Sequence, residues 1–80
     1  MYYVYIIFSD KLQKKYIGFS TDLKNRIKEH NKGKCVSTTK GKPWKLVYYE
    51  AFVSEKDARR EELFLKTGKG RERIKYLLKS

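Results

Sequence analysis

The sequence predicts a small α/β (α+β) domain, in which a three-stranded, mainly antiparallel sheet is flanked by about three helices. Two observations support this fold class. Three segments alternate apolar and polar residues with the period of a strand, and three others repeat apolar residues with the period of a helix. The 80 residues suit one compact core, so we assign residues 1–80 to a single domain.

The first two strands are predicted to form an antiparallel hairpin. Residues 2–8 are rich in aromatic and β-branched side chains, and a short polar segment separates them from a second alternating stretch, residues 14–19. A register that opposes Tyr5 to Gly18 makes the phenols of Tyr5 and Tyr16 diagonal neighbours within reach of each other. The alternative interpretation of two such tyrosines is ordinary cross-strand packing.

Alternation along the first strand separates an apolar face from one that carries phenols. We expect the apolar face to be the core. Its residues are Val4, Ile6 and Phe8, and the opposite face carries Tyr3, Tyr5 and Ile7.

A helix is predicted from about Thr21 to Asn31, with Ser20 or Thr21 as its cap. Arg26 and His30 lie one turn apart at the edge of its buried stripe, where they border the core without belonging to it. Beside the hairpin phenols they would bring a guanidinium and an imidazole to a strand-to-helix junction, an arrangement suited to handling phosphate. The alternatives are a packed, hydrogen-bonded histidine and a surface arginine paired with Asp22 or Glu29.

Residues 32–43 are predicted to form a flexible basic loop, because glycines and a Ser-Thr-Thr run lie among lysines. Such a loop is well composed for phosphate contacts, although a solvated connector has the same composition. With two lysines of the second strand, the candidate nucleic-acid-binding residues are Lys14, Lys15, Lys32, Lys34, Lys40 and Lys42.

Residues 44–53 are predicted to form the third strand, which carries apolar residues on both faces and is therefore expected to be central or covered. Ser54 caps a helix that runs to about Lys66, and Gly68 and Gly70 end it before a last short helix. The residues expected to point inward are Ala58, Phe64, Leu65, Ile74, Leu77 and Leu78, and those expected to point outward are Arg71, Arg73, Lys75 and Lys79.

Two acids, Glu61 and Glu62, lie near the inward side of the helix that follows Ser54. A carboxylate at the edge of the core in so basic a protein either pairs with a cation or holds a metal ion. Spacing does not distinguish Glu61 from Glu62, and a salt bridge is the ordinary outcome for such a residue.

The formal net charge is +11, from 20 Lys and Arg against 9 Asp and Glu, and it indicates a polyanionic partner. The lone cysteine, Cys35, is assigned no role and cannot form an internal disulfide or a cysteine-based zinc site. The longest apolar run, Tyr2–Phe8, is much shorter than a membrane span. We therefore expect a cytoplasmic protein that binds no membrane.

Five features occur in order along the chain: Tyr3-Val4-Tyr5, Tyr16-Ile17-Gly18, Arg26, His30 and the segment ARREELFLK at residues 58–66. Together they resemble the GIY-YIG nuclease domain, specifically its small stand-alone members related to the excision-repair incision subunit. The resemblance covers nearly the whole chain and selects Glu62 over Glu61 as the metal-binding acid. It departs from the family pattern at Tyr3, which replaces a glycine, and in having no asparagine after Asn31.

The resemblance implies a metal-dependent endonuclease that hydrolyses phosphodiester bonds in DNA, with DNA repair as its setting. The implied catalytic residues are Tyr5, Tyr16, Arg26, His30 and Glu62. Glu62 would hold one Mg²⁺ or Mn²⁺ and Arg26 would bind the phosphate. One tyrosine would act as the base while the other orients water or phosphate, and His30 would relay a proton or contact phosphate.

Two other classes of function fit the same composition. A non-catalytic nucleic-acid-binding module needs the cations but has little use for an inward Glu62, whose charge repels phosphate unless a metal ion intervenes. A structural protein of a ribonucleoprotein particle would bind RNA without metal dependence. The sequence favours DNA over RNA only through the family resemblance, and it does not specify the oligomeric state, the preferred DNA structure or the pathway.

Overall fold

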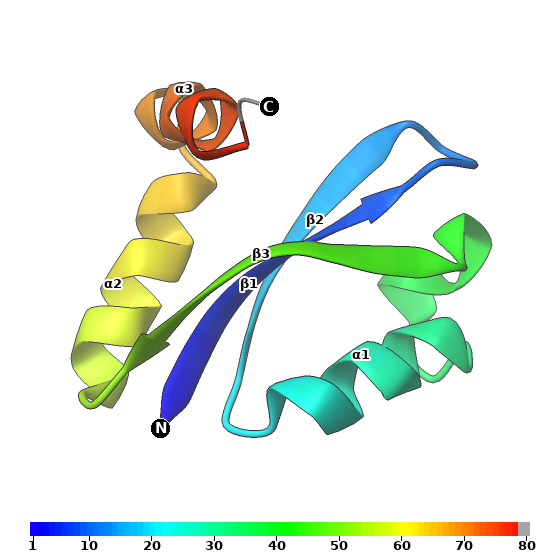
Figure 1. Cartoon of the computed structure of the whole chain (residues 1–80), viewed down its shortest axis with the longest axis horizontal. Helices are drawn as coiled ribbons and strands as arrows, with labels where there is room; N and C mark the ends of the chain where they lie inside the picture. Colours follow the sequence, from blue (N-terminus) through cyan, green and yellow to red (C-terminus); the bar gives the residue numbers. More distant parts are fainter. Residues whose placement is uncertain (79–80) are drawn as a thin grey trace.

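The computed structural model describes residues 1–78, and its elements confirm the predicted fold class (Figure 1). Lys79, expected to point outward, lies outside the described residues. In chain order the elements are β1 (Tyr2–Ser9), β2 (Lys14–Ser20), α1 (Leu23–Asn31), the short 3₁₀ helix η1 (Val36–Gly41), β3 (Trp44–Phe52), α2 (Glu55–Leu65) and α3 (Gly68–Leu77).

The sheet has the strand order β2-β1-β3, and β1 runs antiparallel to both of its neighbours. The prediction that the third strand is central or covered was wrong. The strand buried on both faces is β1, whereas β3 lies at an edge with Val47 and Tyr49 about half exposed. Apolar residues on both faces of β3 therefore do not indicate a central position.

Helices cover both faces of the sheet (Figure 1). On one face Val4 and Ile6 of β1 pack against Ala58 and Leu65 of α2 and Ile74 of α3. On the other face β1 packs against α1, and the residues of that second cluster include Tyr5, Ile7, Trp44, Leu23 and Ile27. The phenol-bearing face of β1 is thus a second core, with Tyr5 and Ile7 as deeply buried as Val4 and Ile6.

The hairpin register agrees with the prediction: Tyr5 pairs with Gly18 and Ile7 pairs with Tyr16. A side chain at Gly18 would overlap the hydroxyl of Tyr5, so the glycine leaves room for the phenol to extend across β2.

Helix α1 begins at Leu23, two positions later than predicted, because its cap is Asp22 rather than Ser20 or Thr21. The Asp22 carboxylate accepts the Asn25 backbone N–H at 3.2 Å. Ser20 is unavailable as the cap because it is still paired within β2, and its hydroxyl accepts the N–H of Asp22 at 3.0 Å.

The segment predicted to be a flexible basic loop contains η1 instead. Thr38 and Gly41 are buried within it, and the indole N–H of Trp44 donates to the Thr38 carbonyl at 2.7 Å. The lysine-rich composition did not indicate this packing, because the lysines are exposed while Gly41 lies against the Trp44 ring and Thr38 is buried.

Helices α2 and α3 meet at Gly70. Ser54 caps α2 as predicted, but Phe64 is 36 % exposed rather than inward. Gly68 and Gly70 do not simply end α2: they form the first turn of α3, which Thr67 caps by accepting the Gly70 N–H at 3.1 Å. A side chain at Gly70 would overlap the backbone of Phe64 and Leu65, so the glycine allows the two helices to approach closely.

No helix among residues 1–78 combines the length and the apolar character needed to cross a membrane.

Replacing Gly70 with Ala should lower the free energy of unfolding by more than about 2 kcal/mol, because the added methyl meets backbone atoms of α2 that cannot move aside. Gly68→Ala is the matched control, since a side chain there meets nothing within 4 Å. It should leave the stability unchanged or raise it by up to about 1 kcal/mol. Urea unfolding followed by circular dichroism measures both changes, and equal losses would contradict the role of Gly70.

Candidate active site

A chain of buried hydrogen bonds runs from β1 through α1 to η1. The Tyr5 hydroxyl lies 2.7 Å from His30 Nε2, and His30 Nδ1 lies 2.7 Å from the Thr38 hydroxyl oxygen. The Thr38 hydroxyl in turn donates to the backbone carbonyl of Cys35 at 3.2 Å. Tyr5, His30 and Thr38 are each 1 % exposed. The prediction that His30 only borders the core was wrong, because the imidazole is one of its most buried members.

The Thr38 hydroxyl sets the direction of this chain. Because its proton is directed to the Cys35 carbonyl, its oxygen accepts from His30 Nδ1–H, which leaves Nε2 to accept the hydroxyl proton of Tyr5. Burial lowers the pKa of His30, and the nearby Arg26 guanidinium lowers it further. The imidazole is therefore neutral at physiological pH, as this hydrogen-bond pattern requires.

Tyr5 is a protonated phenol at neutral pH. Burial raises its pKa, the neighbouring Tyr16 adds to the increase, and the Arg26 guanidinium opposes it. Glu62 also raises the pKa of Tyr5, more weakly. Of the four other residues predicted for the site, His30 thus bonds to the Tyr5 hydroxyl. The other three, Tyr16, Arg26 and Glu62, influence its pKa through their charges.

Tyr16 connects the buried chain to the surface. Its ring packs edge to face against His30, with the ring centroids 5.3 Å apart, and against Trp44 at 6.4 Å. It is partly exposed on the edge strand β2, whereas Tyr5 is enclosed beneath it.

Arg26 lies on the flank of α1 opposite to the one that contacts β3. Its side chain is 42 % exposed and pairs with Glu29 at 3.3 Å, one of the two partners that the sequence suggested. The other, Asp22, caps the helix instead. The guanidinium is therefore accessible to an anion from solvent while its charge still influences Tyr5 and His30.

The two candidate acids of α2 face opposite edges of the sheet. Arg59, one turn before Glu62, stacks on the Phe19 ring of β2 at 3.9 Å, so this flank of α2 faces β2. Glu62 is 14 % exposed and pairs with Arg59 at 3.9 Å and Lys66 at 3.1 Å.

Glu61 faces β3 instead. Burial raises the pKa of its carboxyl, a hydrogen bond with Glu50 of β3 raises it further, and Arg73 lies 4.0 Å away. Of the two acids, Glu62 therefore lies on the side of α2 nearer to Tyr16.

A basic groove with a volume of about 470 Å³ runs along the β2 edge. We define it by its lining residues: Lys14, Lys15, Tyr16, Ile17, Lys66, Arg71, Ile74 and Lys75. Lys66 joins the groove to Glu62. The groove thus places Tyr16 among five cations.

Only two of the six predicted nucleic-acid-binding lysines, Lys14 and Lys15, line the basic groove. The other four, Lys32, Lys34, Lys40 and Lys42, are exposed around η1. Three cations of the groove were not among the predicted binding residues: Lys66, Arg71 and Lys75. The i, i+4 spacing of Arg71 and Lys75 shows that they share a helix face, but it does not show that this face meets the hairpin.

The donor set near Tyr16 suits a hard cation with few protein ligands. Among residues 1–78 no three Asp, Glu, His or Cys side chains cluster tightly enough to form a ready metal cage. Mg²⁺ is commonly held by one or two carboxylates with waters completing its shell, and Glu62 offers one such carboxylate. Lys66 and Arg59 pair with its two oxygens, so an incoming ion would take the place of the Lys66 ammonium.

Comparison with known proteins identifies the class to which this arrangement belongs. A family model described as the GIY-YIG catalytic domain matches residues 1–75, and the chain therefore belongs to the GIY-YIG family, whose domain is a nuclease fold.

The relatives are small stand-alone members called UPF0213 proteins. One from Pediococcus acidilactici is 35 % identical over 95 % of this chain and 80 % of its own length. Another, from Clostridium perfringens, is 40 % identical over 82 % of this chain and 71 % of its own length. The solution structure of a UPF0213 protein from Bacillus halodurans is 36 % identical and superposes with a TM-score of 0.59, over 96 % of this chain and 85 % of that one. These names state no reaction.

The buried imidazole should make stability depend on pH. Because the pKa of His30 is lowered in the folded state, the unfolded chain binds more protons below its ordinary pKa of about 6.5. The free energy of unfolding should therefore fall as the pH drops from 7.5 to 5.5, by at most about 1.4 kcal/mol per pH unit from this group.

His30→Gln removes the only histidine, so urea unfolding of this variant at both pH values should show a smaller loss than in the wild type. The raised pKa of the Glu61 carboxyl makes the free energy of unfolding rise as the pH drops. Glu61 is present in both the wild type and the variant, so its contribution does not affect their comparison. An equal loss in both would show that His30 does not control this dependence.

Proposed function

We propose that this protein is a metal-dependent endonuclease that hydrolyses phosphodiester bonds in DNA. The observation that carries the proposal is the position of Tyr16, which packs on the buried Tyr5–His30 pair and also lines the basic groove. A phosphodiester in the groove would thus lie against a group that connects to a buried proton acceptor. Membership of a family with a nuclease fold supports the same reaction class.

In the proposed reaction, the Tyr5–His30 pair takes up a proton from the attacking water. A free phenolate is costly at Tyr5, since burial raises its pKa. The hydroxyl can instead accept a proton while passing its own to the neutral Nε2 of His30, to which it already donates. Tyr16, on the groove side, orients the water or the phosphate. Tyr5 is then the group that deprotonates the water, and His30 accepts the proton that Tyr5 passes on rather than contacting phosphate.

Arg26 and Glu62 would deal with the negative charge of the phosphate. The exposed guanidinium of Arg26 can donate two parallel hydrogen bonds to phosphate oxygens. Glu62 would hold Mg²⁺ or Mn²⁺, and such an ion, when bound, neutralises charge that builds up on the phosphate. Lys66, released from Glu62, would remain in the groove as a further contact to the DNA backbone.

One observation favours a second candidate function, a non-catalytic nucleic-acid-binding module with the same fold. Glu62 already has two cationic partners, so its position near the core is explained without a metal ion. Such a module would use the basic groove in the same way but would not depend on Mg²⁺ or Mn²⁺.

Cleavage assays separate these two functions. Labelled single-stranded, duplex and branched DNA, with RNA for comparison, would be incubated with the protein in the presence and absence of Mg²⁺ or Mn²⁺. We expect metal-dependent DNA products, and a loss of at least about 100-fold in rate for Glu62→Gln, equivalent to roughly 3 kcal/mol of barrier.

Glu61→Gln is the matched control for the cleavage assay, because it removes a neighbouring carboxylate that faces β3, and it should retain most of the activity. Tight binding without products in any condition would support the binding module.

The basic groove should set the salt dependence of DNA binding. Each phosphate contact contributes about −0.9 to the slope of log K against log salt for duplex DNA. The double variant Arg71→Ser/Lys75→Ser should make this slope less negative by about two, as measured by fluorescence anisotropy. Lys56→Ser/Arg60→Ser removes the same charge from the exposed side of α2, outside the groove, and should change the slope less. Equal effects would mean that net charge, and not the groove, determines binding.

A further inference from the structure

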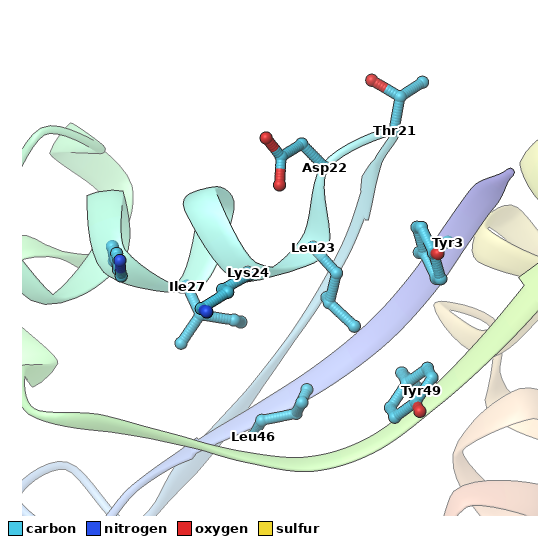
Figure 2. Close-up of a pocket in the computed structure, with 9 residues that line it drawn as sticks. Tyr3, Thr21, Asp22, Leu23, Lys24, Ile27, Leu46 and Tyr49 are labelled. Carbon is cyan, nitrogen blue, oxygen red and sulfur yellow. The ribbon is translucent and has the colours of Figure 1, made fainter.

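A second hollow, of about 590 Å³, lies between α1 and β3. Figure 2 shows the side chains that surround it: the rings of Tyr3 and Tyr49 rise from the sheet, and Leu23 extends toward them from α1. Its volume falls within the range of pockets that hold small organic groups. We call it the tyrosine pocket.

The tyrosine pocket is an aromatic and aliphatic surface that the fold leaves partly open. Tyr3 and Tyr49 pack edge to face with their ring centroids 6.2 Å apart. Tyr49 is 54 % exposed, and Leu46 is 38 % exposed. Leu46 is three residues before Tyr49 but lies on the same face, because the pairing of β3 with β1 shifts register between them. Edge strands usually carry polar or charged residues on their open surface, so an exposed tyrosine and leucine over a hollow mark a surface that can receive a ligand.

Two lysines stand at the rim of the tyrosine pocket. Lys24 and Lys28 are one turn apart on α1 and share a flank with Asn31, whose amide donates to the Trp44 carbonyl of β3 at 3.1 Å. Arg26 lies on the opposite flank of the helix. The pocket and the basic groove share no lining residue, so the pocket is separate from the groove and its own cations can bind phosphate. The nearby acid, Asp22, is engaged as the helix cap.

Tyr3 is one of the two departures of this chain from the family pattern, since the first tripeptide of the family has glycine at that position. The structure gives this departure a physical meaning. With glycine there, the pocket would lose one of its two rings. The ring of Tyr3 packs against the exposed ring of Tyr49, and together the two rings form an aromatic wall of the pocket.

We propose that the tyrosine pocket binds an unpaired base of a DNA strand, which stacks on Tyr49 while Lys24 and Lys28 contact the adjoining phosphates. Stacking on an aromatic ring combined with cations along the backbone is the general mode of single-strand binding, and it tolerates any base. The choice of DNA as the ligand rests on the proposed function. The pocket goes beyond that function by predicting a preference for single-stranded or frayed DNA.

The register places the tyrosine pocket close to the proposed site of cleavage. Tyr49 pairs with Tyr5 across β1 and β3, and Tyr5 pairs with Gly18 across β1 and β2. The row Gly18–Tyr5–Tyr49 spans two strand spacings, or about 10 Å. A DNA strand bound in the tyrosine pocket can therefore also reach Tyr5 and the β2 edge of the sheet.

Binding of fluorescein-labelled 12-nucleotide DNA, measured by anisotropy in EDTA, tests the inference. Three ligands are compared: a single strand with bases, an abasic single strand of the same length (the strand without bases), and a duplex. Tyr49→Ala should weaken binding of the strand with bases about tenfold, from the loss of one stacking contact. It should leave the strand without bases and the duplex unchanged.

Tyr76→Ala is the matched control, because it removes another exposed tyrosine, 77 % exposed, from α3. It should not alter binding of any of the three ligands. Tyr49→Leu keeps apolar bulk at the site and covers the case in which Tyr49→Ala fails to fold, and it should show the same selective loss. Thermal unfolding of each variant establishes that it is folded at the temperature of the assay.

Three outcomes would overturn the inference: an equal loss on the strand without bases, no loss on the strand with bases, or a change in oligomeric state of Tyr49→Ala on size-exclusion chromatography. The last would assign the pocket to contact between copies of the chain. Because EDTA removes any metal-dependent cleavage, a selective loss of binding supports the inference even if the protein never cleaves DNA. The proposed nuclease activity is tested separately, by the cleavage assay.

Discussion

The hydrogen bond between Tyr5 and His30 is the constraint on which the rest of the site depends. It is fully buried, so each partner must be satisfied, and a donor or acceptor left unpaired there would cost about 1–3 kcal/mol. Three separate parts of the chain serve it. Gly18 leaves space for the phenol, α1 supplies the imidazole, and η1 supplies the Thr38 hydroxyl that fixes the tautomer.

This constraint explains why a small basic domain keeps polar groups in its second core. A domain of 80 residues has little apolar area to spare, yet one face of β1 carries a tyrosine that bonds a histidine. An apolar pair in the same positions would not need Thr38 at all. The arrangement is understandable if the proton at Tyr5 has a function, because then the imidazole must be neutral, oriented and protected from water.

The two edges of the sheet present different surfaces, and the central strand β1 separates them. The β2 edge combines Tyr16 with cations from the hairpin, α2 and α3, which suits a phosphate backbone. The β3 edge combines exposed aromatic and aliphatic side chains with two lysines, which suits a base with its adjoining phosphates. Glu62, held by Arg59 and Lys66, brings the negative charge of the site to the β2 edge alone.

Much of the fold and the identity of the site residues could be predicted from local pattern. The period-2 alternation of the hairpin determined its register, so the pairing of Tyr5 with Gly18 was correct. The helical spacing placed Arg26 and His30 one turn apart, and the Ser54 cap marked the start of α2. These features depend on residues close in the chain, and their physical causes are steric and periodic.

What local pattern could not supply is which surfaces meet. The edge position of β3, the burial of His30 and the packing of η1 under Trp44 all result from contacts between segments far apart in the chain. The same is true of the basic groove, where α3 reaches the hairpin because Gly70 lets it pack closely on α2. The sequence by itself determined the elements and the chemical groups. The tertiary structure decided which of those groups are buried together and which remain open to a ligand, because burial is a property of the packed whole.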